Sequence, residues 1–217
     1  MNLDQMQSMW QAHSEKLDEC MSLNKTLLQK IQSEGHKSEL NKLIWARALE
    51  GFLFLIIVVG LWHYVVSSWS LTAPVVSALV LNVFATLGLA GSIGQVVLLS
   101  KIDFSQPVRE TLSGLIAVRA HGMTIFKLLL LSAPFYMAYV FLGYDLVVGI
   151  DLFSLMPAET KVIFAIISAV FGVLVALLIN QLKPENRSKK LIGWLYREVS
   201  GSRLTHLLDQ FDNMEKA

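Results

Sequence analysis

The chain has 217 residues, of which 54% are hydrophobic and only 16% are charged, and its mean hydropathy is +0.53. These values exclude a single soluble domain, because the core of a domain of this length cannot bury so many apolar side chains. The lipid bilayer is therefore the expected environment of much of the chain. A formal net charge of +1 without a basic stripe argues against nucleic acid as a partner, and the single cysteine, Cys20, excludes an internal disulfide.

Residues 1–49 are predicted to form a cytoplasmic arm with an amphipathic helix. Two series of mostly apolar side chains recur every seven residues and are offset by three, a heptad pattern typical of a helix that packs against another helix. The members that we expect to contact a partner are Leu3, Met6, Trp10, Leu17, Asn24, Leu27 and Ile31. An equally good interpretation is that this stripe folds onto the rest of the same chain, and the pattern leaves both open.

Residues 50–100 are predicted to form a transmembrane hairpin. No Asp, Glu, Lys or Arg lies between Glu50 and Lys101, and a Ser-rich patch with a proline interrupts this tract halfway. A helix crosses the hydrocarbon core in about 20 residues. We therefore expect spans at about 51–66 and 75–99, joined by a short turn.

The second of these spans carries a face of small and amide side chains. Small residues let two helix backbones approach closely in a membrane, and amides form hydrogen bonds between helices. The helix-packing residues that we predict are Gly88, Gly91, Ser92, Gly94 and Gln95. The pattern does not distinguish packing within one chain from packing between copies, so a homo-oligomer is an open alternative.

The second half of the chain repeats this organisation. Helical spacing of apolar side chains predicts a cytoplasmic helix over residues 101–122. Residues 123–182 are predicted to form a second transmembrane hairpin, with spans at about 123–144 and 162–182. Residues 183–217 carry two short apolar stripes, which predict amphipathic tail helices.

Three features near the membrane carry specific expectations. Pro134 is expected to kink the third span, because proline lacks the N–H that an inner helical position donates. Arg47 and Glu50 are three residues apart and are expected to form an ion pair at the inner interface. His63, beside two aromatic residues, is interpreted as an interfacial histidine.

The fold class follows from these segments. The apolar tracts are continuous and lack the alternation of barrel strands, so the chain is predicted to be all-α, with four transmembrane helices. The arm, the central helix and the tail cannot each bury an apolar stripe alone, which predicts a small cytoplasmic helical bundle. Seventeen of the eighteen Lys and Arg residues lie on one side of this topology, so both termini are expected in the cytoplasm.

No sequence motif predicts a catalytic, cofactor-binding or metal-binding site. The sequence contains no P-loop, no HExxH, no G-x-S-x-G and no Cys/His cluster with ligand spacing. Ionisable residues are nearly absent from the predicted spans, where their cost usually marks a function. We therefore predict a non-enzymatic protein without catalytic, cofactor-binding or metal-binding residues.

Two stretches carry a resemblance to a known family. Leu3-Asp4 with Trp10 and Lys16-Leu17, together with the run Leu-Ser-Lys-Ile-Asp-Phe-Ser-Gln-Pro-Val at residues 99–108, resemble an uncharacterised family of four-span bacterial inner-membrane proteins. Some similar proteins are encoded near RNA polymerase sigma factors. The resemblance implies a membrane-tethered, anti-sigma-like regulator whose arm binds a soluble partner, although this chain has no zinc-binding anti-sigma motif.

The expected function is that of an inner-membrane scaffold or signalling protein, which presents cytoplasmic helices to a protein partner. The alternative is a small transporter or channel subunit that acts as a homo-oligomer. In that case Asn82, Ser92, Gln95 and Pro134 are the residues expected to line the path.

Overall fold

The computed structural model describes residues 35, 37–104, 106, 108–182, 192–195, 199, 204, 205 and 208. Within this part of the chain every regular element is helical and there is no strand. Four helical segments are long and apolar enough to cross a membrane, namely Lys37–Ser67, Ala73–Ser100, Arg109–Val148 and Ala158–Gln181. The predicted all-α class and the predicted number of spans are therefore confirmed.

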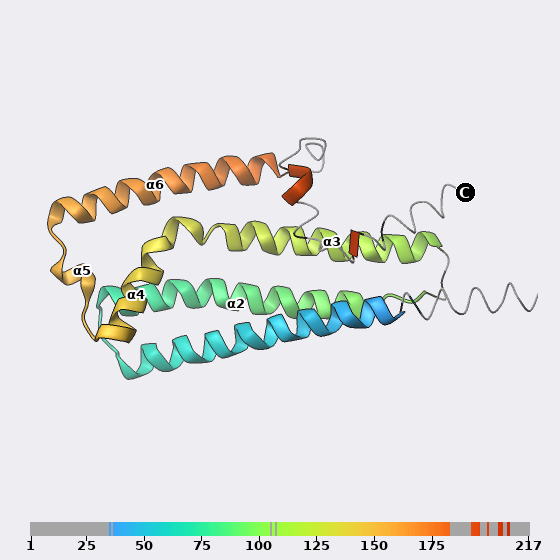
Figure 1. Cartoon of the computed structure of the whole chain (residues 1–217), viewed down its shortest axis with the longest axis horizontal. Helices are drawn as coiled ribbons and strands as arrows, with labels where there is room; N and C mark the ends of the chain where they lie inside the picture. The colour runs from blue at the N-terminus through green and yellow to red at the C-terminus, as the bar shows by residue number, and fades with distance from the viewer. Residues whose placement is uncertain are drawn as a thin grey trace, which may run out of the picture.

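The first long helix (Lys37–Ser67) and α2 (Ala73–Ser100) form an antiparallel hairpin (Figure 1). The turn between them falls in the Ser-rich patch that interrupts the apolar tract. Thr72 has an extended backbone at the start of α2, and Pro74 lies in the first turn. Proline is tolerated there because the first N–H groups of a helix have no partner within the helix.

Two helices are longer than the spans expected from the sequence. The first long helix begins at Lys37 and passes the expected border at residue 49 without a break. Likewise, α3 (Val108–Leu130) passes the expected border at residue 122 between the central helix and the third span. A continuous helix bonds its own N–H and C=O groups on both sides of a membrane interface, so neither border requires a break.

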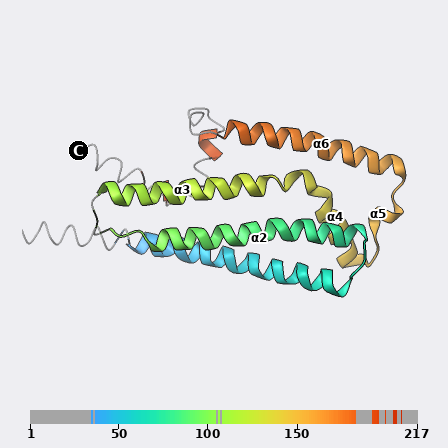
Figure 2. The ribbon, with the colours of Figure 1, turned by 180° about the vertical axis from the view of Figure 1, so that it is seen from behind.

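The third span is bent at Pro134, as predicted. After α3 the chain forms a turn in which Ser132 N–H donates to the Leu129 carbonyl at 2.9 Å, and then a short 3₁₀-helix, η1 (Ala133–Phe135). Helix α4 (Tyr136–Val148) follows in a new direction, across the ends of the first long helix and α2 (Figures 1 and 2).

Helix α4 closes one end of the bundle, which we call the hairpin end because it holds the turn between the first long helix and α2. An apolar core joins the three helices there, with Val65, Val75, Ala78, Leu81, Ala138 and Leu142 buried. At the same end Tyr64 Oη donates a hydrogen bond of 2.5 Å to Asp145 Oδ2. The crossing helix is thus held by both apolar and polar contacts.

A short connection leads from α4 to the last long helix. Gly149 ends α4 with a φ of 73°, a left-handed conformation that glycine adopts without strain. Asp151 caps the single turn α5 (Leu152–Leu155) by accepting a hydrogen bond of 3.3 Å from Ser154 N–H. This segment is mainly a connector, since only one helical turn forms before α6.

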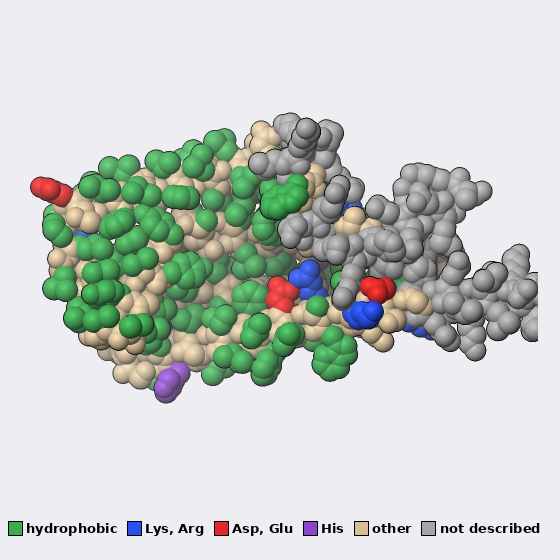
Figure 3. Space-filling model, viewed as in Figure 1, with side chains coloured by type: hydrophobic (Ala, Val, Ile, Leu, Met, Phe, Trp, Pro, Cys, Tyr) green, Lys and Arg blue, Asp and Glu red, His purple; other side chains and the backbone are tan. Residues whose placement is uncertain are grey.

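Helix α6 (Ala158–Gln181) lies at the edge of the bundle (Figures 1 and 2). All of its residues are described, and of these only Val175 is buried. It contacts the rest mainly at η1. Directly after η1, at the start of α4, the ring of Tyr136 has its centroid 5.7 Å from that of Phe171. The face of the molecule seen in Figure 3 is accordingly covered with apolar side chains over much of its length.

The opposite end of the bundle, where the first long helix begins and α2 meets α3, carries Lys42, Arg47, Lys101 and Arg109, and we call it the basic end. A second apolar core lies there. Its buried members come from the first long helix, α2, α3 and the tail, and they are Leu40, Leu99, Leu115, Val118, Leu204 and Leu208. Part of the predicted tail stripe therefore packs onto the same chain.

Candidate functional site

The small-residue face of α2 packs against the first long helix on one side. A Cβ atom on Gly88 would lie 2.5 Å from the ring of Phe54, closer than real Cβ contacts. One turn further along, a Cβ on Gly51 would lie 3.3 Å from the Cβ of Ser92. The two backbones therefore approach closely only because glycine stands at these contacts.

The same face packs against α3 on its other side. A Cβ on Gly91 would lie 2.5 Å from Ile125 Cγ2, and one on Gly94 would lie 2.6 Å from His121 Nε2. His121 Nε2 also lies 3.2 Å from the backbone carbonyl oxygen of Gly91, within hydrogen-bond distance. The structure thus brings the five predicted packing residues into contacts between helices of one chain.

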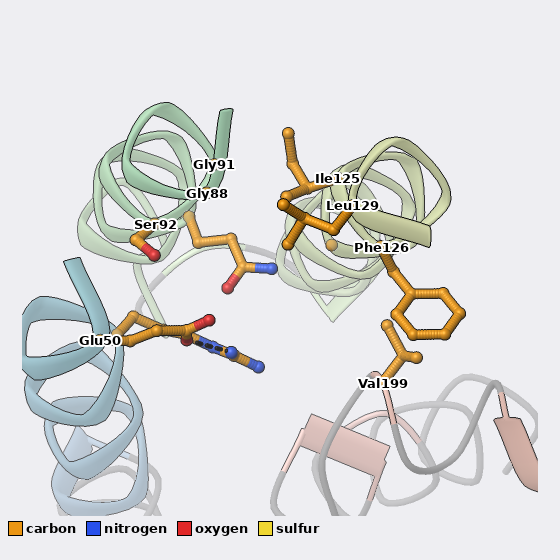
Figure 4. Close-up of a pocket in the computed structure, with 11 residues that line it drawn as sticks. Glu50, Gly88, Gly91, Ser92, Ile125, Phe126, Leu129 and Val199 are labelled. Carbon is orange, nitrogen blue, oxygen red and sulfur yellow. Dashed lines mark hydrogen bonds and ion pairs between the residues drawn. The ribbon is translucent and has the colours of Figure 1, made fainter. Parts of the chain in front are cut away.

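A cavity of about 310 Å³ opens beside these contacts, between the first long helix, α2, α3 and the tail (Figure 4). We call it the Arg47–Glu50 cavity. Its lining combines charged, polar and apolar side chains with three glycines, namely Arg47, Glu50, Gly88, Gly91, Ser92, Gln95, Gly122, Ile125, Phe126, Leu129 and Val199. A smaller hollow of about 10 Å³ shares Arg47, Gln95, Gly122 and Val199 and reaches Arg119.

The charged part of the cavity comes from the first long helix. Arg47 Nη1 donates to Glu50 Oε2 at 2.6 Å, which confirms the predicted ion pair. Both side chains are partly exposed, at 27% for Arg47 and 41% for Glu50. In Figure 4 the Glu50 side chain points from its helix toward the space between α2 and α3.

The polar part of the cavity comes from α2. Ser92 is 4% exposed and Gln95 is 8% exposed, so both residues are almost fully buried in the protein. Neither makes a side-chain hydrogen bond to another residue that the structure describes. Buried amides and hydroxyls usually have partners, because losing their bonds to water costs free energy. These two groups can therefore bond to a molecule in the cavity.

The apolar part of the cavity comes from α3 and the tail. Ile125, Phe126 and Leu129 face it from α3, and Val199 lies opposite the Phe126 ring (Figure 4). Phe126 and Val199 also pack around the small apolar core formed by the buried residues Met123, Leu182 and Ile192. One wall of the cavity is therefore continuous with this apolar core.

Other residues considered from the sequence lie elsewhere. The predicted partner-binding residues of the arm, from Leu3 to Ile31, lie outside the described residues. His63 is exposed near the hairpin end, and Asn82 is buried with no partner for Nδ2 among the described residues. The described part of the chain contains no group of three or more His, Cys, Asp or Glu that could hold a metal ion.

Sequence reasoning found the ion pair and the packing face but did not connect them. Gly51, directly after Glu50, was the available signal, because a glycine next to a charged pair at a membrane border permits a close neighbour on that side. Comparison with known proteins adds no assignment: no family model, no curated protein and no solved structure matches this chain.

Proposed function

We propose that this chain is a non-enzymatic scaffold or signalling protein of a bacterial inner membrane, with its basic end and both termini in the cytoplasm. The distribution of seventeen Lys and Arg residues against one supports this orientation, since cytoplasmic loops carry the excess of basic residues. The resemblance at residues 99–108 to four-span bacterial proteins supports the choice of membrane and a regulatory role of the anti-sigma type.

The observation that carries the proposal is the apolar core at the basic end. Leu40, Leu99 and Leu115 come from three different long helices, and Leu204 of the tail joins them. Protein cores are close-packed and transmit displacements between the elements that share them. A protein bound at this end is therefore linked mechanically to the membrane helices, which is what a scaffold or a signalling protein requires.

The partner can be identified by purifying the tagged full chain from native membranes and analysing bound proteins by mass spectrometry. We expect at least one soluble protein to be retained by the full chain and lost when residues 1–32 are deleted, because that segment carries the predicted heptad stripe. Reporter fusions at both termini test the orientation in the same cells and should both report the cytoplasm.

Trp69→Ser is the matched control for this experiment. Trp69 is exposed in the turn at the hairpin end, so its replacement leaves the basic end unchanged and should retain the partner. If deletion of residues 1–32 leaves both the bound proteins and the native oligomer unchanged, the scaffold proposal is wrong.

A transporter or channel subunit is the second candidate, and the Arg47–Glu50 cavity is the observation that favours it. Ser92 and Gln95, two of the four residues expected along a path, both line this cavity. Asn82 is buried elsewhere on α2, and Pro134 lies near Gly172 of α6. Solute or ion flux in liposomes that Gln95→Met alters would favour this candidate over the scaffold.

A further inference from the structure

The Arg47–Glu50 cavity holds both signs of charge at the border of the apolar surface. Figure 3 shows charged side chains of both signs where that surface ends toward the basic end. Arg47 and Glu50 supply one cation and one anion on the same wall, and the opposite wall, with Ile125 and Phe126, is apolar. A ligand that fits this lining carries an anionic group, a cationic group and an apolar part.

The bond between Arg47 and Glu50 uses only some of the hydrogen-bonding groups of these two side chains, so others can bind such a ligand. A guanidinium has five N–H donors, and the bond to Glu50 uses Arg47 Nη1 alone. A carboxylate has two oxygens, and that bond uses Oε2 of Glu50. Gln95 is 8% exposed as a residue, and it lines the same cavity without a side-chain hydrogen bond to a described residue. Donors for an anion and an acceptor for a cation therefore lie together.

The size of the cavity narrows the class of ligand. Sites for drug-sized ligands start at about 300 Å³, so a cavity of about 310 Å³ holds a compact polar group and not a whole lipid. The apolar wall formed by Phe126 and Leu129 lies in the last turns of α3, within the third span expected at about 123–144. An acyl chain attached to the polar group would follow that wall.

We propose that the Arg47–Glu50 cavity binds the headgroup of a phospholipid that carries a primary ammonium group. The phosphodiester accepts hydrogen bonds from Arg47 and from the Gln95 amide, and the ammonium donates to the Glu50 carboxylate. A quaternary ammonium has no N–H to donate, so Glu50 distinguishes an ethanolamine headgroup from a choline headgroup. Lipid binding in this cavity is independent of the protein that binds at the basic end.

Native mass spectrometry of the full chain in detergent tests the proposal with three lipids of identical acyl chains: phosphatidylethanolamine, phosphatidylcholine and phosphatidylglycerol. We expect phosphatidylethanolamine to bind at least several-fold more tightly than the other two. Arg47→Gln should weaken its binding about ten-fold or more, because a hydrogen bond to a charged group is lost. Equal binding of the three lipids would overturn the proposal.

Glu50→Gln gives a sharper readout than a loss of affinity. It replaces the carboxylate by an amide of the same shape, and it should remove the preference for ethanolamine over choline. Lys42→Gln is the matched control, because Lys42 pairs with Glu39 at 3.1 Å with the same three-residue spacing but does not line the cavity. An equal effect of Lys42→Gln and Arg47→Gln would contradict the assignment.

Two further arms separate the source of the headgroup and the effect of misfolding. Soluble O-phosphoethanolamine should compete at least a hundred-fold more weakly than the lipid, and competition at equal concentrations would assign the cavity to a soluble ligand instead.

Gln95→Met keeps the size of the side chain and removes the amide. It should weaken lipid binding while the thermal unfolding temperature of the protein stays within a few degrees, and unchanged binding would contradict the phosphate contact.

Discussion

Helices α2 and α6 are both long and apolar enough to cross a membrane, but they are packed very differently. In the most apolar stretch of α2, 44% of the residues are buried inside the protein, compared with 6% in α6. The helix whose most apolar stretch has the lower mean hydropathy is the better packed one. In lipid, large apolar side chains need no protein partner, whereas small and polar side chains are useful where helices touch.

This difference in burial identifies the residues that hold the bundle together. Buried positions of α2 include Gly88, Gly91, Ser92 and Gln95, while α6 buries only Val175 among its residues. Substitutions of the same kind in the two regions should therefore have different effects on the free energy of unfolding.

The largest effect is expected from Leu115→Ala in the core at the basic end. Leu115 is fully buried between four segments of the chain, so truncation leaves a cavity and should cost about 2–5 kcal/mol of unfolding free energy. Leu177→Ala on α6 is the control, because Leu177 is 58% exposed and should cost about 0.5 kcal/mol or less. Unfolding titrations in mixed micelles measure the unfolding free energies of both variants. Equal losses would contradict the difference in packing between the core at the basic end and α6.

A smaller effect is expected from Gly91→Ala. The added Cβ would meet the β-branched Ile125 side chain at 2.5 Å, so α2 and α3 must separate, at a cost of about 1–3 kcal/mol. Gly172→Ala makes the same change in α6, where the nearest atom, Pro134 Cγ, is 3.8 Å away. That variant should gain about 0.5–1 kcal/mol from the better helix propensity of alanine. A loss of stability in Gly172→Ala would show that α6 packs more tightly than described.

The smallest effect is expected from Tyr64→Phe at the hairpin end. The change removes the hydrogen bond from Tyr64 Oη to Asp145 and should cost about 1–2 kcal/mol, because the acceptor is a half-buried carboxylate. Tyr139→Phe is the control on α4, the helix that carries Asp145, because Tyr139 is exposed and should be replaced without measurable loss. The midpoints of thermal unfolding of the two variants in one detergent measure this difference. Identical midpoints would contradict a stabilising role for the bond from Tyr64 to Asp145.

Much of the fold was predictable from local properties. The charge-free tract between Glu50 and Lys101 predicted a hairpin, and the structure places its turn at the expected serines. Pro134 predicted the bend of the third span for another local reason, because proline has no backbone N–H to donate. The helix ends were less predictable, because nothing in the sequence at residues 49 or 122 forces a helix to stop.

The candidate site was predictable only in pieces. Arg47 and Glu50 were expected to pair because they lie close together on one helix. Gly91 and Gln95 were expected to pack against another helix, but spacing does not tell which helix. Their meeting in one cavity depends on how the first long helix and α2 pack against each other, and Gly51 and Gly88 permit the close approach of these two helices.

The helical class, the number of spans and the place of the bend follow from the amino-acid sequence alone, because the length of an apolar tract and the position of a proline act within one segment. Only the tertiary structure decided that α2 lies at the centre, that α6 lies at the edge, and that Arg47, Glu50 and Gln95 share a cavity. Those outcomes depend on close contacts between side chains far apart in the chain, which the membrane's uniform preference for apolar residues does not specify.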